Sequence, residues 1–128
     1  MRSRYAAFAL GRGDYLAATL AQGHPDLEGP RDQLVRELSR AHDRQRFMGL
    51  RVVSATVSGD EGEVLFHARI FERGSDRSFA ELSRFVRQDG AWRYASGILV
   101  AAADLPEDLD TLDRATFLAR AGSETREA

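Results

Sequence analysis

The chain has 128 residues, of which 43% are hydrophobic and 30% charged, with a formal net charge of −2. This length fits one domain with a single modest core, and a charge near zero supplies no field to attract nucleic acid or an acidic membrane. The absence of cysteine excludes disulfides and thiolate metal sites within these residues.

Three further absences narrow the function classes. The three histidines lie far apart and lack the spacing of a zinc-binding helix. No apolar run approaches the roughly 18 residues needed to cross a bilayer, and no secretory signal pattern opens the chain. We therefore expect a cytoplasmic protein with no metal, no cofactor, no membrane partner and no nucleic-acid partner.

Helical patterns occupy the first third of the chain. Residues 2–10 carry apolar side chains at helical spacing, and Gly11 follows as a C-terminal stop. A second short helix is predicted over residues 15–20 and a third over residues 31–42. The loop between them, residues 21–30, holds two glycines and two prolines.

The next part of the chain is typical of strands. We predict four strands, over residues 48–58, 63–72, 77–88 and 91–97. All links are short, which favours an antiparallel meander. Asp89-Gly90 is a strong signal for a tight two-residue hairpin turn.

The positions of the turns sort the strand side chains into two faces. If the second hairpin is centred on Ser75, Arg69 lies opposite Glu81 and His67 lies opposite Ser83. One face is then aliphatic and comprises Val53, Ala55, Val57, Val64, Phe66, Ala68, Ile70, Ala80, Leu82 and Val86. The other is aromatic with polar groups among the rings, and comprises Leu50, Val52, His67, Arg69, Phe71, Phe79, Glu81, Ser83, Phe85, Trp92 and Tyr94.

Two apolar faces require two covers. The three helices can cover one face, and the other needs either the C-terminal segment or a second copy in a homodimer. Residues 104–120 can form a helix, because Asp104–Glu107 resembles a capping box and leucines follow at helical spacing. We therefore expect a domain over residues 1–103 and a C-terminal helical extension over residues 104–128, with a frayed polar tail after Gly122.

Two segments resemble the YchJ-like family: residues 1–11 (MRSRYAAFALG) and residues 81–97 (ELSRFVRQDGAWRYASG). In that family a zinc-binding SEC-C segment usually precedes a domain similar to nuclear transport factor two. The resemblance implies a cone-shaped α+β fold, with three N-terminal helices packed on a curved four-stranded antiparallel sheet and often a cavity between them. It implies no reaction, since the family has no settled activity.

The family's opening motif normally lies well inside the chain, whereas here it starts at residue 1. Either the gene begins upstream of Met1, or this member lacks the SEC-C segment.

Small-molecule pockets combine aromatic walls with a few converging polar groups. The aromatic face supplies such a set, and Arg4 of the opening motif could reach an anion at its edge. The ligand-binding candidates are Arg4, Tyr5, Glu81, Ser83, Phe85, Trp92 and Tyr94.

Two functions remain open. The first is a non-catalytic module that binds a small ligand or a protein. The second is an isomerase- or hydratase-type enzyme using Glu81, His67 and Tyr5, in which Glu81 would have a raised pKa and His67 would act as a base. Glu81 and His67 also have structural explanations: Glu81 would pair with Arg69 across the strands, and His67 would be a half-buried structural histidine. Ala80 stands where the family often has histidine, which weakens the enzymatic hypothesis.

Overall fold

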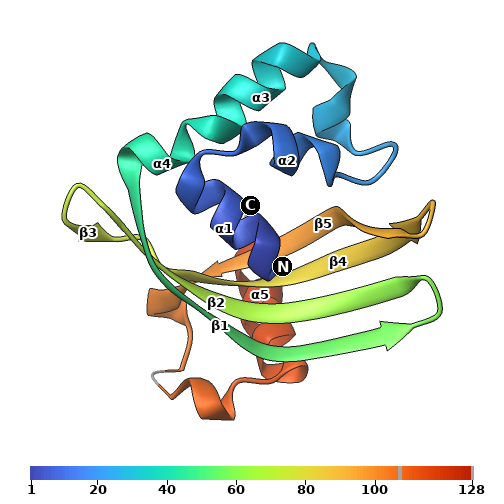
Figure 1. The fold of residues 1–128 in the computed structure, drawn as a ribbon. Helices are drawn as coiled ribbons and strands as arrows, with labels where there is room; N and C mark the ends of the chain where they lie inside the picture. The colour runs from blue at the N-terminus through green and yellow to red at the C-terminus, as the bar shows by residue number, and fades with distance from the viewer. Residues whose placement is uncertain (107, 128) are drawn as a thin grey trace.

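The computed structural model describes residues 1–106 and 108–127, with side chains up to residue 121. Four short helices come first (Figure 1). They are α1 (Arg2–Leu10), α2 (Gly13–Ala18), α3 (Arg31–Ser39) and α4 (Ala41–Arg44), with a 3-10 turn, η1 (Pro25–Glu28), before α3. The predicted first helix is confirmed, and Gly11 ends it in the left-handed conformation with φ of 71°. The predicted third helix is divided at Arg40.

A curved antiparallel sheet follows and wraps around α1 (Figure 1). Its strands are β1 (Gln45–Ser58), β2 (Glu61–Glu72), β3 (Ser75–Asp76), β4 (Phe79–Gln88) and β5 (Ala91–Ala101). The order is β1-β2-β4-β5, with the short β3 paired to β2. The meander is confirmed, although β5 continues past its predicted end at Gly97.

The hairpin between β2 and β3 corrects the predicted register. It turns between Arg73 and Gly74, which have φ of 51° and 79°, and Glu72 pairs with Ser75. Two positive φ values match the two-residue turn that suits the right-handed twist of paired strands. The prediction that the hairpin is centred on Ser75 is wrong.

This displacement exchanges the two faces of β2, because side chains alternate and an odd shift reverses them. Glu81 lies opposite Phe66 and not opposite Arg69, so the predicted cross-strand ion pair is absent. His67 pairs with Ala80, on the face that turns away from the N-terminal helices. The β4 side chains keep their predicted face, whereas those of β2 change sides.

The N-terminal helices cover the inner, concave face of the sheet. Phe85 is buried there, and Tyr94 packs against the cluster formed by Ala17, Leu20 and Leu34. A neighbouring cluster joins α1 to the middle of β2. It contains Phe66, Ala68 and Ile70, with Met1, Tyr5, Phe47, Leu50, Val64 and Phe79 packed against it.

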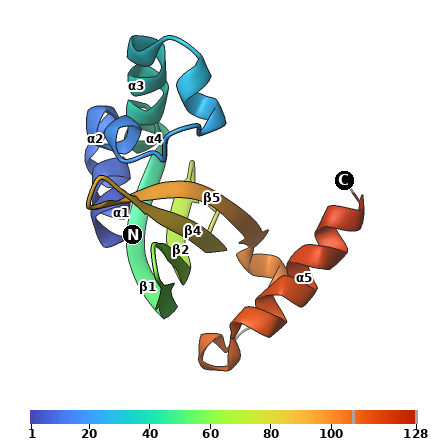
Figure 2. The same ribbon diagram turned by 90° about the vertical axis from the view of Figure 1, so that its right-hand side faces the viewer.

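The outer face is covered by the C-terminal helix α5 (Arg114–Glu127) (Figure 2). The shared cluster contains Leu65, Ala80, Leu82, Val100, Leu105, Leu112, Phe117 and Ala121. Of the two expected covers, the C-terminal segment and a second copy of the chain, the C-terminal segment therefore lies on this face. The homodimer stays a prediction. Within the part of the chain described, no helix is both long enough and apolar enough to cross a membrane.

The start of the C-terminal helix differs from the prediction. Residues Ala102–Asp104 and Leu109–Thr111 form 3-10 turns, and the helix begins only at Arg114. Its first turn is capped by Asp113, whose Oδ1 accepts a hydrogen bond from the Thr116 amide at 2.7 Å. Glu107, the last residue of the predicted capping box, lies outside the described residues, and the predicted frayed tail falls where no side chains are described.

Candidate functional site

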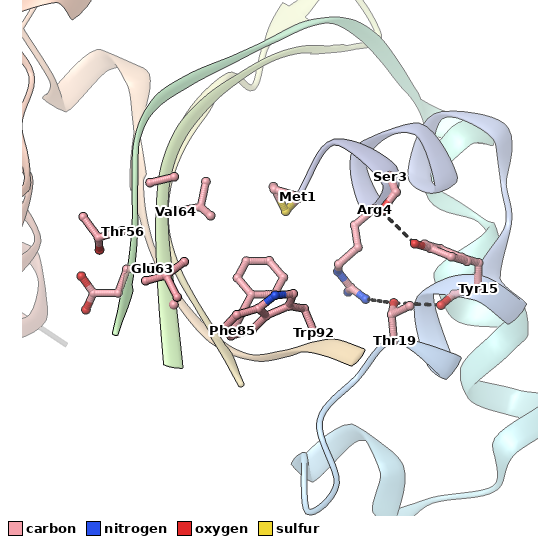
Figure 3. Close-up of a pocket in the computed structure, with 13 residues that line it drawn as sticks. Met1, Ser3, Arg4, Tyr15, Thr19, Thr56, Glu63, Val64, Phe85 and Trp92 are labelled. Carbon is pink, nitrogen blue, oxygen red and sulfur yellow. Dashed lines mark hydrogen bonds between the residues drawn. The ribbon is translucent and has the colours of Figure 1, made fainter. Parts of the chain in front are cut away.

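A cavity of about 250 Å³ lies between the N-terminal helices and one end of the sheet (Figure 3). It reaches solvent, since Tyr15 and Trp92 in its wall are 38% and 39% exposed. Its lining comprises Met1, Ser3, Arg4, Tyr15, Thr19, Ala55, Thr56, Val57, Gly62, Glu63, Val64, Phe85 and Trp92.

The side chains that face the cavity are mostly apolar. Figure 3 shows Phe85 and Trp92 on the sheet side of the cavity, with Met1, which precedes α1, between the sheet and the helices. Glu63 contributes little charge, because its side chain turns to the far side of the strands, where the Arg114 guanidinium donates to its carboxylate at 2.8 and 3.2 Å. This ion pair also holds the pKa of Glu63 below its usual value.

Arg4 is the arginine that lines this cavity, although it is only 6% exposed. Its Nη1 donates to the Leu16 carbonyl at 3.0 Å and to the Thr19 hydroxyl at 2.5 Å. The guanidinium carbon lies 4.7 Å from the centre of the Tyr94 ring, in a cation–π contact. Burial lowers the pKa of Arg4, while Tyr94 and then Glu81 oppose this shift.

A buried carboxylate lies beyond that ring. Glu81 is 7% exposed, and its Oε2 accepts hydrogen bonds from the Ser83 hydroxyl and, at 2.9 Å, from the Tyr94 hydroxyl. Burial raises the pKa of Glu81, although both hydrogen bonds and Arg4 act to lower it. Burial also raises the pKa of Tyr94, and the Glu81 carboxylate adds to this effect. Tyr94 thus connects Glu81 to Arg4, and Glu81 itself does not line the cavity.

Gly97 makes room for this contact, a role that sequence reasoning missed. A Cβ atom there would lie 2.5 Å from Glu81 Oε2 and in even closer contact with the Tyr94 hydroxyl. Gly97 pairs with Ser83 across the hairpin. The sequence did mark Gly97, because this glycine closes the second family-like segment. The backbone conformation of Gly97 has no positive φ, however, and so gives no reason for glycine at this position.

The ligand-binding candidates meet in part. The inner face gathers Arg4, Glu81, Ser83, Phe85, Trp92 and Tyr94, of which Arg4, Phe85 and Trp92 line the cavity. Sequence reasoning missed Tyr15 of α2, Thr19 directly after α2, and the ends of β1 and β2, because these reach the cavity only through tertiary packing.

The proposed catalytic set does not assemble. Tyr5 lies apart from the cavity: its hydroxyl accepts a hydrogen bond from the Gly49 amide at 2.8 Å, and its ring contacts Phe47 edge-on at 5.6 Å. His67 lies on the opposite face from Glu81. Burial lowers the pKa of His67, and the nearby Arg51 and Arg69 lower it further, against Asp76. The structure therefore does not bring Glu81 and His67 together at one site.

The Glu81→Gln variant is expected to become more stable relative to the wild type as the pH rises from about 4 to about 8. Stability here is the free energy of unfolding. Burial raises the folded-state pKa of Glu81 above 4.5. The stability that protonated Glu81 contributes is therefore fully present below its unfolded-state pKa and is lost as the pH rises through its folded-state pKa. Glutamine does not titrate. Urea unfolding of both proteins at several pH values measures the difference, and a difference that stays constant with pH would contradict the buried placement of Glu81.

Comparison with known proteins gives a consistent result. The family model for the middle NTF2-like domain of YchJ matches residues 1–97. A UPF0225 protein of Chromobacterium violaceum is 37% identical over 102 residues, which are 77% of this chain and 70% of that protein. A UPF0225 protein of Pectobacterium carotovorum is 40% identical over 106 residues, covering 78% of this chain and 64% of the relative. The chain thus spans about two thirds of the length of these relatives.

A solved structure is similar in both sequence and fold. The solution structure of a SEC-C motif containing protein from Rhodopseudomonas palustris is 35% identical. It superposes on 76% of this chain and 73% of its own chain, with a TM-score of 0.64.

Proposed function

The chain belongs to the YchJ-like family through its NTF2-like domain, and from this premise we propose that the domain is a non-catalytic module that binds a small molecule in the cavity between α1, α2 and the sheet. The observation that carries this proposal is a solvent-connected cavity of about 250 Å³ whose apolar walls hold one buried arginine. Mostly apolar walls with a small number of placed polar groups are typical of small-molecule sites.

The arrangement of polar groups favours binding over catalysis. A general acid or base must come within hydrogen-bond reach of the reacting atom. The Glu81 carboxylate accepts hydrogen bonds from the Ser83 and Tyr94 hydroxyls and lies behind the Tyr94 ring. His67 is on the other side of the sheet. The role left for Glu81 is to position Tyr94, which in turn supports Arg4.

Ligand binding can be followed through Trp92, the one tryptophan of the chain, which lies in the cavity wall. We expect phenylacetate, 2-phenylethanol or both to change its fluorescence in a saturable way. Val64→Phe should weaken this binding at least about tenfold, because the added ring occupies the cavity that Val64 lines.

Val86→Phe is the matched control, since Val86 lies on β4 outside the cavity lining and receives the same added volume. It should bind both probes as the wild type does. If neither probe affects Trp92, or if Val64→Phe binds as well as Val86→Phe, the cavity is not a binding site.

A further inference from the structure

The buried Arg4 guanidinium has no matching carboxylate. Its acceptors, the Leu16 carbonyl and the Thr19 hydroxyl, are both neutral. Among the residues that the structure describes, no aspartate or glutamate forms an ion pair with it. Glu81 is the buried carboxylate of this region, and the Tyr94 hydroxyl and ring stand between the two. A buried charge without a direct partner is costly, and an added anion would offset that cost.

One edge of the guanidinium has no acceptor among the described residues. Nη1 holds the group against α2, whereas Nε is buried without an acceptor. Nε and Nη2 form the edge of arginine that binds a carboxylate side-on through two parallel hydrogen bonds. A carboxylate that reaches the guanidinium from the cavity would neutralise its charge and supply the acceptor that this edge lacks.

The remainder of the cavity fits an apolar body. Its volume of about 250 Å³ corresponds to on the order of eight water molecules, which limits the occupant to a small molecule. Phe85 and Trp92 form its floor, and Figure 3 shows the Arg4 side chain extending toward the same space. The acidic side chain in its lining, Glu63, is occupied by Arg114 on the other side of the strands.

We propose that the cavity binds a small organic anion whose carboxylate pairs with Arg4 and whose apolar body lies against Phe85 and Trp92. This inference rests on the proposed function and specifies its ligand class. A neutral molecule of the same shape leaves the buried cation unpaired, and a cationic one adds a second positive charge beside it.

Three probes of nearly equal size and shape test the ligand class on the wild-type protein: phenylacetate, 2-phenylethanol and 2-phenylethylammonium. Their dissociation constants are obtained from Trp92 fluorescence. A hydrogen-bonded charge pair predicts that phenylacetate binds at least about tenfold more tightly than 2-phenylethanol, with 2-phenylethylammonium weakest. This comparison needs no variant and therefore cannot be confused with unfolding.

Variants then assign the preference to one arginine. Arg4→Met should reduce the ratio between phenylacetate and 2-phenylethanol to within about threefold, and Arg4→Lys should retain part of it because the charge remains. Arg93→Met is the matched control. Like Arg4, Arg93 donates from Nη1 to a carbonyl of α2, that of Ala18, and has a buried Nε without an acceptor. Unlike Arg4, it does not line the cavity. It should keep the full ratio.

The outcomes separate the two proposals. Equal binding of phenylacetate and 2-phenylethanol to the wild type overturns the anion preference and leaves the binding module standing. A preference that survives in Arg4→Met, whatever the result in Arg93→Met, overturns the assignment to Arg4. Failure of all three probes to bind removes the proposed function itself.

Discussion

Replacing Phe117 with alanine is expected to lower the free energy of unfolding by about 3–5 kcal/mol. Phe117 is fully buried and is the largest side chain by which α5 packs on the outer face of the sheet, beside Leu65, Leu82 and Val100. Its removal takes apolar contacts from both layers and leaves a cavity that the strands cannot close. Chemical denaturation followed by circular dichroism measures the change.

Arg120→Ala is the control for this substitution, because Arg120 lies on the exposed side of the same helix and its loss should change stability by no more than about 0.5 kcal/mol. The comparison is informative because α5 lies beyond residues 1–97, which the family model covers. If Phe117→Ala costs less than about 1 kcal/mol, α5 is not the outer layer of this fold in solution.

Gly97→Ala is expected to cost about 1–3 kcal/mol and to separate the Tyr94 hydroxyl from Glu81. The new methyl group would occupy the space where these two groups meet, 2.5 Å from Glu81 Oε2. Neither can move aside easily, because Glu81 is buried and the Tyr94 ring is fixed between Arg4 and Phe85. Displacement of Tyr94 would also remove the support of Arg4, so the preference for phenylacetate should decrease together with stability.

Two controls accompany Gly97→Ala. Gly49→Ala introduces the same methyl group into β1, where its Cβ would meet no atom within 4 Å, and should be neutral or slightly stabilising. In a Tyr94→Phe background the cost of Gly97→Ala should be smaller, because one of the two clashing groups is gone. Equal costs at Gly97 and Gly49, or an undiminished cost in the Tyr94→Phe background, would contradict the placement of Gly97 against the Glu81–Tyr94 contact.

The parts of the fold that local signals define were predictable from the sequence. Gly11 ends α1 through a conformation that glycine adopts without strain, and Asp89-Gly90 forms the expected hairpin turn, with φ of 53° and 77°. Because that turn is correctly placed, the β4 and β5 residues of the aromatic face, including Phe85 and Tyr94, lie together on the inner face as predicted.

The register of β2 was not predictable in the same way. The link between β2 and β4 offers Arg73, Gly74 and Ser75 as turn residues. The actual turn requires a positive φ at Arg73, and residues other than glycine, asparagine and aspartate seldom adopt a positive φ. A small displacement of the centre reverses every side chain of the strand. The ion pair assigned to Glu81 and Arg69, and the placement of His67 beside Ser83, both failed for this reason.

The site itself depends on contacts that no local pattern encodes. Arg4 becomes a buried cation only because α1 packs against both α2 and the Tyr94 ring, which are distant from it in the sequence. The sequence indicated an arginine near an aromatic face. It could not indicate that Nη1 of this arginine would bind α2 while its Nε has no acceptor.

A crystal structure of the protein with phenylacetate decides whether the cavity beside Arg4 holds an organic anion. We expect the ring of the probe to lie against Phe85 and Trp92, with a carboxylate oxygen about 2.7–3.2 Å from a guanidinium nitrogen of Arg4. A cavity that stays empty at saturating phenylacetate, or a probe bound with its carboxylate directed away from Arg4, would contradict it.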